Sequence, residues 1–297
     1  YMRRTSPSEA VHDIFQLSEL SAAKQVRASL LDHGDQLLLG LYQAEDVFLT
    51  RILPVLDNFG LVVRESWATE IQSRGGKLFL DTFVLDPTAK LPAELLRERK
   101  VLLERAIEAI FGSQVEDDPL NELVLTAGLS WRQVDVIRGY TEYSRQLTVK
   151  LSANRLIEIL QKNPQMSRSL VEYFEARFDP DLEGDRDGAM AKAADRADKQ
   201  LRRIISHDED LVFSTLFELM RGSLRTNYYR TDKPFHFISF KLDCEKVDSL
   251  GPVRPMYEIY VHHREVEGVH LFEVGRESPS HGARAGEVAR EGAREAA

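Results

Sequence analysis

Residues 36–85 read QLLLGLYQAEDVFLTRILPVLDNFGLVVRESWATEIQSRGGKLFLDTFVL, and their hydrophobic pattern changes from a strand period to a helix period and back. Gln36–Tyr42 is a short apolar run between polar residues, which predicts a strand. Asp46–Asn58 repeats apolar residues at helical spacing, and Pro54 inside this pattern predicts a kink or a helix that starts near it. Gly60 stands where a left-handed residue commonly ends a helix. The stretch therefore begins with a strand and a helix.

The rest of the stretch predicts strands around a glycine turn. Leu61–Ser66 and Ala68–Gln72 favour strands, and residues 74–76 form a turn into a further strand at Lys77–Leu85. Apolar residues then recur on one side of Pro92–Phe111, which predicts a helix. The order of strand, helix, strand, strand and helix is the beginning of a ferredoxin-like split βαβ unit. We therefore expect an α+β chain that contains a ferredoxin-like module.

Helix signals lie on both sides of this module. Before it, Thr5–Leu20 predicts a short amphipathic helix that Ser6 caps, with Pro7 at its first position. After it, the helix starts are a capping box at Ser130 and Gln133, a cap at Ser152, and Asn163 followed by Pro164. A charged linker and two helices follow, at residues 179–188, 189–205 and 208–224. The middle of the chain is therefore expected to be a layer of packed helices.

Length, composition and charge limit the possible functions. The 297 residues are 43% hydrophobic and 29% charged, as in a soluble globular protein of two or three compact units. The net charge of −9 argues against binding to nucleic acid, which needs clustered Lys and Arg. No apolar run approaches the roughly 20 residues of a membrane-spanning helix. The single cysteine, Cys244, suits a reducing compartment. We expect a cytoplasmic protein with neither a nucleic-acid nor a membrane partner.

The sequence contains no motif for catalysis, cofactor binding or metal binding. It has no glycine-rich phosphate loop, no zinc-type cysteine pair and no serine nucleophile motif. Residues 179–188 (DPDLEGDRDG) resemble part of a calcium loop, but the required carboxylate at the twelfth position is missing, which favours a solvated acidic linker. Cys244 has no assigned base and is interpreted as an unreactive thiol. We therefore predict no catalytic, cofactor-binding or metal-binding residue.

The densest group of metal-ligand side chains lies near the end of the chain. It comprises His262, His263, Glu265, Glu267 and His270. In one continuous strand these side chains would point to two opposite sides, whereas a turn at Arg264–Glu265 would change that geometry. A metal site is possible in principle, but we interpret these residues as ordinary surface residues of strands.

Leu224–Leu271 predicts the end of a helix followed by strands. At the helix end, Arg225 near the helix dipole and Asn227 in a left-handed turn account for a C-terminal cap. The expected strands are Phe235–Leu242, Tyr257–His262 and Val266–Leu271.

Several passages of the sequence resemble the region upstream of the catalytic core in the large NAD-specific bacterial glutamate dehydrogenases, and their order and spacing match as well. They are TSPSEAVHDI, RILPVLDNFGLVVRESW, DPLNELVLTAGLSWRQVDVIRGYTEYSRQL, LVEYFEARFDP, LRTNYY, and the run from SFKLD through RPMYEIYVHH to VEGVHL. The resemblance covers most of Thr5–Leu271. It implies an N-terminal helix and connection at residues 1–34, an ACT-like module at 35–111, a helical region at 112–232, the start of a catalytic domain at 233–271, and a non-family, disordered tail at 272–297.

The resemblance also implies a function. The complete enzyme would oxidise L-glutamate to 2-oxoglutarate and ammonia with NAD, as a homo-oligomer. The family's substrate lysines and nucleotide-binding domain have no counterpart in this sequence. We therefore expect a scaffolding or regulatory piece that is inactive alone and binds no cofactor, cut short by a frameshift or a truncated gene assignment.

Two other hypotheses about the function stay open. The first is a stand-alone ACT-like regulatory module that binds an amino acid. The resemblance places its effector at the helix-end loop, here near Asn58 and Gly60. The second is a structural helical protein that binds no ligand and has a stable partner.

Overall fold

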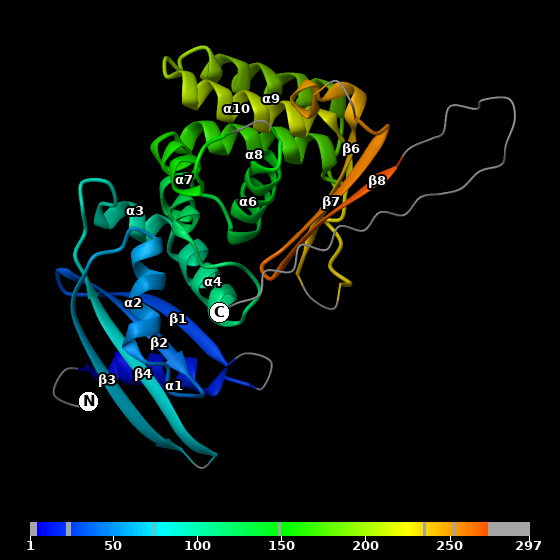
Figure 1. The fold of residues 1–297 in the computed structure, drawn as a ribbon. Coiled ribbons are helices and arrows are strands. Elements are labelled where there is room, and N and C mark those ends of the chain that lie inside the picture. Colours follow the sequence, from blue (N-terminus) through cyan, green and yellow to red (C-terminus); the bar gives the residue numbers. More distant parts are fainter. Residues whose placement is uncertain are drawn as a thin grey trace, which may run out of the picture. The chain divides into compact units, whose positions relative to one another are not determined.

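The computed structural model describes residues 5–21, 25–73, 75–147, 150–233, 236–251 and 254–272 (Figure 1). The chain divides into two compact units, residues 1–134 and 135–297. Both units combine helices with an antiparallel sheet, which confirms the mixed α+β class. Among the described residues, no helix has both the length and the apolar character needed to cross a lipid bilayer.

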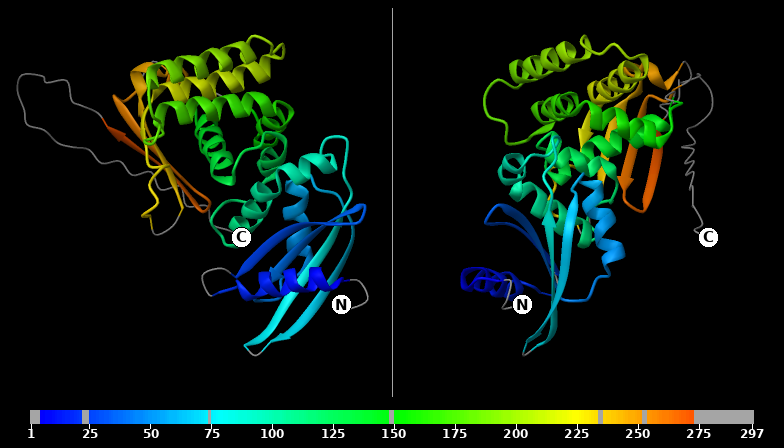
Figure 2. Two further views of the ribbon diagram at one scale, coloured as in Figure 1. Left: turned by 180° about the vertical axis from the view of Figure 1, so that it is seen from behind. Right: turned by 90° about the vertical axis from the view of Figure 1, so that its left-hand side faces the viewer.

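Unit 1 is built around a four-stranded sheet. Its elements are α1 (Pro7–Ser18), β1 (Val26–His33), β2 (Gln36–Gln43), α2 (Leu49–Asn58), β3 (Val63–Ser73), β4 (Gly76–Leu85), α3 (Ala93–Glu98), α4 (Lys100–Phe111), the 3₁₀ helix η1 (Pro119–Glu122) and α5 (Leu123–Thr126). The strand order is β1-β2-β4-β3, and all neighbours are antiparallel. Strand β4 thus separates β2 from β3, which run parallel to each other. Figure 2 shows α1 and α2 on opposite faces of this sheet.

The predicted N-terminal helix is confirmed, together with its cap. In α1 the Glu9 N–H donates to Ser6 Oγ at 3.3 Å, and the Ser6 N–H donates to Glu9 Oε2 at 2.7 Å. This capping box satisfies two backbone donors at the helix start. The inner side of α1 then packs Leu17 against Tyr42 and Leu80. Helix α1 is therefore held both by its cap and by the sheet.

Strand β1 was not predicted, because the sequence pattern indicated only a helix and a connection before residue 35. It forms since Gly34, with φ +60, allows a tight turn that pairs β1 with β2 along its whole length. Helix α4 then covers the edge of β1. The N–H groups of Ala28 and Leu30 donate to Glu108 Oε1 at 3.3 Å and Glu104 Oε1 at 2.7 Å. These carboxylates accept hydrogen bonds from N–H groups that would otherwise be unpaired at the edge of the sheet.

Two other predicted boundaries in unit 1 are wrong. The two strands predicted on either side of Trp67 are one continuous strand, β3, because β4 pairs with it without a break there. The helix predicted over Pro92–Phe111 is two helices, since Arg99 between α3 and α4 has φ −103 and ψ 13. The pairing of Ser73 with Gly76 confirms that β3 turns directly into β4, while Arg74 lies outside the described residues.

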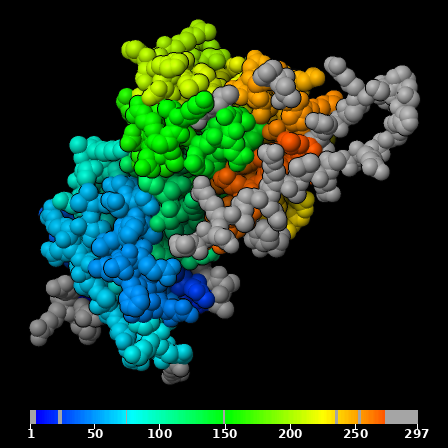
Figure 3. All heavy atoms as spheres, viewed as in Figure 1, coloured from blue at the N-terminus to red at the C-terminus, as the bar shows by residue number. Residues whose placement is uncertain are grey.

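Unit 2 contains a layer of helices and a second sheet. Its elements are α6 (Trp131–Arg145), which begins in unit 1, α7 (Ala153–Lys162), α8 (Pro164–Phe178), α9 (Arg186–Leu201), α10 (His207–Gly222), β5 (Ser223–Thr226), β6 (Ile238–Asp243), the 3₁₀ helices η2 (Cys244–Lys246) and η3 (Asp248–Leu250), β7 (Tyr257–His263) and β8 (Val266–Phe272). The sheet order is β5-β6-β7-β8, again antiparallel throughout. In Figure 3, atoms of the helix layer (green to yellow) lie next to atoms of the sheet (orange).

Most of the predicted helix starts are confirmed. The Ser130 N–H donates to Gln133 Oε1 at 2.7 Å, and the Gln133 N–H donates to Ser130 Oγ at 3.3 Å, which is the expected capping box. Ser152 caps α7 through the Arg155 N–H at 3.3 Å. Helix α8 begins at Pro164 as predicted, but the side chain of Asn163 makes no cap hydrogen bond there and donates to the Ile159 carbonyl instead.

Aromatic side chains join the helix layer to the sheet. The ring of Tyr140 on α6 stacks on Phe240 of β6 with centroids 4.0 Å apart. Gly139 permits this approach, because a Cβ built there would lie 3.1 Å from the Phe240 ring. The Tyr140 hydroxyl is 2.8 Å from Ser223 Oγ, so its one polar group is also satisfied.

The predicted helix end at Leu224 is wrong. Helix α10 stops at Gly222, and the next residues form β5, which pairs with β6. Asn227 does not have the left-handed backbone that a C-terminal cap would require, and its side-chain oxygen accepts from the Ser239 N–H at 2.8 Å. The three later strands are confirmed, with β6 beginning at Ile238; Phe235, where it was predicted to begin, lies outside the described residues.

Candidate functional site

The loop predicted to bind an effector lies at the end of α2. Gly60 has φ +74, so its left-handed backbone is confirmed. The Asn58 Nδ2 donates to Asp117 Oδ1 at 3.0 Å, and a Cβ on Gly60 would lie 3.2 Å from Glu122 Oε2. Glu122 in turn pairs with Lys90 Nζ at 2.5 Å. Both loop residues are therefore in contact with the segment at residues 117–122 of the same unit.

A cluster of charged side chains lies within unit 2, between α6 and the sheet, and Glu267 is its one exposed member. Asp135 on α6 is at its centre, and only 4% of it is exposed. Its Oδ1 accepts from Arg138 Nη1 at 2.8 Å, and its Oδ2 is 2.7 Å from His236 Nε2. His262 on β7, 2% exposed, places Nε2 3.7 Å from Asp135 Oδ1 and Nδ1 3.5 Å from Glu267 Oε1 on β8. We call these five residues the charge cluster.

The charges in this cluster balance. Burial alone would raise the pKa of Asp135, but the contacts with His236 and His262 and the charge of Arg138 outweigh burial and hold the pKa well below its ordinary value. The contact with His262 likewise lowers the pKa of Glu267. Burial would lower the pKa of His262, yet Asp135 and Glu267 raise it to about 9. At neutral pH, two carboxylates therefore face the guanidinium and a protonated imidazole.

The register of the strands separates the side chains that the sequence grouped as possible metal ligands. His262 pairs with Glu267, whereas His263 pairs with Val266 and His270 pairs with Ile259. Glu265 lies in the turn, so the alternative with a turn at residues 264–265 is confirmed. The expectation that all of these residues lie on the surface is wrong for His262, which is buried beside Asp135. Among the described residues, no three His, Cys, Asp or Glu side chains are placed to hold a metal ion.

Cys244 is buried and unpaired. Burial raises the pKa of its thiol to about 12, so the thiolate is scarce at neutral pH. The expectation of an unreactive thiol is consistent with this position in the core.

Comparisons with known proteins extend over most of the chain. Residues 23–97 match a family model described as glutamate dehydrogenase, ACT3 domain, and residues 115–180 match glutamate dehydrogenase, helical motif 3. Residues 196–295 match the catalytic domain of bacterial NAD-glutamate dehydrogenase. An NAD-specific glutamate dehydrogenase of Mycobacterium tuberculosis is 33% identical over 91% of this chain, and one of Halomonas elongata is 30% identical over 99%. The chain belongs to the family of NAD-specific glutamate dehydrogenases.

The chain is much shorter than these relatives. It spans 17% of the length of the mycobacterial protein and 18% of the Halomonas protein. A third NAD-specific glutamate dehydrogenase, from Pseudomonas aeruginosa, is 29% identical over 99% of this chain, which again spans 18% of that protein. This member of the family thus corresponds to one region of a longer polypeptide in each relative.

The family matches differ from the predicted boundaries. The ACT3 match begins at residue 23 and so includes β1, which the predicted module at 35–111 leaves out. The catalytic-domain match begins at residue 196, within α9 and ahead of the predicted start at 233, and it runs to residue 295. The predicted non-family tail at 272–297 lies outside the described residues beyond Phe272.

The charge cluster joins two of these matches. Asp135 and Arg138 belong to helical motif 3, whereas His236, His262 and Glu267 belong to the catalytic-domain match. Sequence patterns singled out His262 and Glu267 but neither Asp135 nor Arg138. Asp135 and Arg138 stand three residues apart on a helix turn that also carries Val134, Val136 and Ile137. An oppositely charged pair among apolar residues was the one sequence signal that could have indicated a buried ion pair. Residues matched to a helical motif and residues matched to a catalytic domain thus share one set of charges.

Proposed function

We propose that this chain is the scaffolding, and in part regulatory, region of an NAD-dependent glutamate dehydrogenase. The complete enzyme would convert L-glutamate, NAD and water to 2-oxoglutarate, ammonia and NADH. The observation that carries the proposal is the order of the three family matches, an ACT3 domain, helical motif 3 and the catalytic domain, along one chain. In this proposal the enzyme is a cytoplasmic homo-oligomer.

The scaffold role has a physical basis in unit 2. A strand pair such as β7–β8 is marginally stable by itself and needs a covering layer to bury one face. Here α6 supplies that layer through the Tyr140–Phe240 stack and the charge cluster. We infer that the helical motif holds the first strands of the catalytic domain in place.

We further propose that unit 1 is a ferredoxin-like, ACT-like module with an altered chain order. Strands β2, β3 and β4 with helix α2 have the pairing of a split βαβ unit. The remaining edge position, beside β2, is taken by β1, which precedes this unit in the chain. The finer division at residues 35–111, 112–232 and 233–271 stays a prediction.

We expect the isolated chain to form no NADH from NAD and L-glutamate. The sequence has no glycine-rich nucleotide loop and no counterpart of the family's substrate lysines, so neither reactant is positioned. Absorbance at the NADH band, with a full-length relative as positive control, measures this. Glutamate-dependent NADH formation by the purified chain would refute the scaffold proposal.

The effector loop provides a second, regulatory test. An amino acid that binds at Asn58 and Gly60 has to compete with Asp117 and Glu122, which already contact these residues. Isothermal calorimetry with amino acids separates the two functions. Amino-acid binding that Asn58→Ala weakens at least tenfold supports a stand-alone amino-acid sensor. If no amino acid produces a binding heat, the scaffold proposal is favoured. Asp57→Ala, at the exposed residue next to Asn58, is the matched control.

A further inference from the structure

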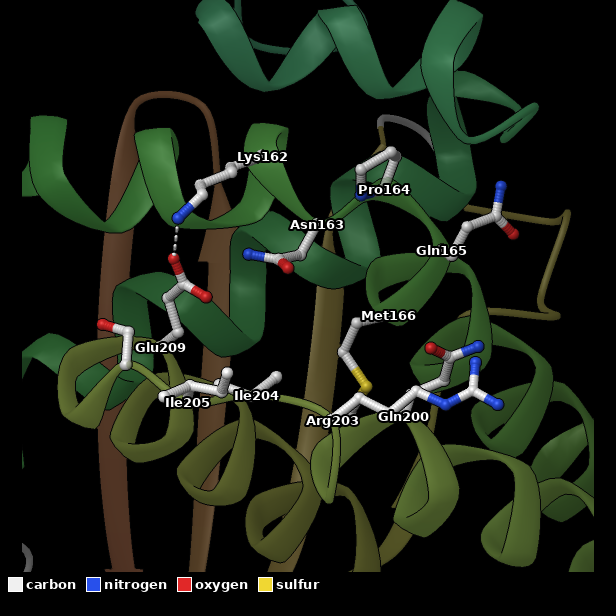
Figure 4. Close-up of a pocket in the computed structure, with 11 residues that line it drawn as sticks. Lys162, Asn163, Pro164, Gln165, Met166, Gln200, Arg203, Ile204, Ile205 and Glu209 are labelled. Atoms are coloured by element: carbon white, nitrogen blue, oxygen red, sulfur yellow. Dashed lines mark hydrogen bonds and ion pairs between the residues drawn. The ribbon is translucent and has the colours of Figure 1, made fainter.

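An open groove lies in unit 2, where two helix–helix turns face each other. Lys162 to Met166, between α7 and α8, form one wall, and Gln200 and residues 203–206 with Glu209, between α9 and α10, form the other (Figure 4). Its volume is about 660 Å³. This lies within the range of about 300–1,000 Å³ that is usual for ligand sites.

Arg203 gives the groove a positive charge without a counter-ion among the described residues. Lys162 Nζ lies 2.5 Å from Glu209 Oε1, and Glu209 is only 6% exposed, so these two charges cancel each other. The Arg203 guanidinium makes no hydrogen bond or ion pair with any residue in the described part of the chain. A guanidinium without a counter-ion favours a partner that brings a carboxylate.

The groove also exposes apolar surface beside that charge. Ile205 is 99% exposed, next to the half-buried Ile204, while Met166 closes the groove from the opposite wall. Because burial of apolar surface favours association, Ile205 offers a partner an apolar anchor. The amide side chains of Gln165 and Gln200 flank this surface and can pair with a peptide main chain.

We propose that this groove binds an extended peptide segment of a partner protein that carries a large apolar side chain beside an Asp or Glu. The apolar side chain packs against Met166, Ile204 and Ile205. The carboxylate binds Arg203, and the two glutamines hold the main chain. None of its residues belongs to the charge cluster or to the effector loop.

A heptapeptide phage library selected on the purified chain tests the proposal. We expect the enriched peptides to combine an aliphatic or aromatic residue with Asp or Glu within two positions. Synthetic versions of these peptides should bind Arg203→Glu at least tenfold more weakly, and Ile205→Ser about tenfold more weakly. Arg202→Glu is the matched control, because it makes the same charge change one residue away and outside the groove, and it should alter the Kd by less than twofold.

Three results would overturn the proposal. The first is a selection without binders, and the second is a set of binders that Arg203→Glu leaves unaffected while circular dichroism shows that the variant is folded. The third is self-association of the chain in sedimentation velocity that Arg203→Glu abolishes and Arg202→Glu does not. That outcome would assign the groove to a second copy of this chain instead of a separate partner.

Discussion

Asp135→Asn is expected to lower the unfolding free energy of unit 2 by about 3–5 kcal/mol, which is the usual effect of removing one partner from a buried ion pair. The substitution keeps the shape of the side chain but removes the charge between Arg138 and His262. The imidazole can respond by losing its proton, whereas the guanidinium cannot. Urea unfolding followed by the near-ultraviolet signal of tyrosine measures the change, because seven of the nine tyrosines lie in unit 2.

The control for this variant is Glu158→Gln on α7. Glu158 pairs with Arg155 at 3.3 Å, but both side chains are exposed, so the expected loss is below about 1 kcal/mol. A loss from Asp135→Asn no larger than that of the control would mean that the charge cluster does not stabilise the unit.

The stability of unit 2 should fall by about 3 kcal/mol between pH 6 and pH 9. The folded pKa of His262, about 9, lies above its ordinary value of 6.5. A raised pKa means that the stabilisation is fully present below pH 6.5 and is lost as the pH rises through 9. Asp135 and Glu267 have lowered pKa values and Arg138 stays protonated, so His262 is the member of the cluster whose folded-state charge changes at the upper end of this window.

His262→Gln should flatten this dependence while it lowers stability at pH 6. Urea unfolding at half-unit pH intervals checks both points. The series stops at pH 9 because the Cys244 thiol, whose pKa is raised in the folded state, adds its own pH dependence at higher values. If the unfolding free energy of His262→Gln falls with pH as steeply as that of the wild type, a group other than His262 releases the proton.

The sequence predicted the elements whose signals are local. The capping box of Ser130 and Gln133, the left-handed Gly60 and the start of α8 at Pro164 each depend on a few neighbouring residues, and each was confirmed. The hairpin at residues 74–76 was predicted for the same reason.

The elements that sequence reasoning missed depend on distant residues. Strand β1 has no clean alternation, and its edge is satisfied by Glu104 and Glu108, more than seventy residues away. Strand β5 is too short for a periodic signal and forms by pairing with β6. Sequence spacing could place His262 in a strand, but only the packing of α6 brings Asp135 to it.

The candidate site was predictable to the same limited degree. Asn58 and Gly60 were placed at a helix-end loop, where they lie, but their contacts with Asp117 and Glu122 come from a segment some sixty residues later. Similarly, the groove at Arg203 and Ile205 is formed by two turns that no local pattern connects.

Hydrogen exchange of the whole chain, compared between the wild type and Asp135→Asn, tests most directly whether the helical motif and the first catalytic-domain strands are one folding unit. We predict that the variant speeds amide exchange in α6, β7 and β8 together, while β2 and β4 of unit 1 keep their protection. Faster exchange confined to α6, with β7 and β8 unchanged, would contradict the account.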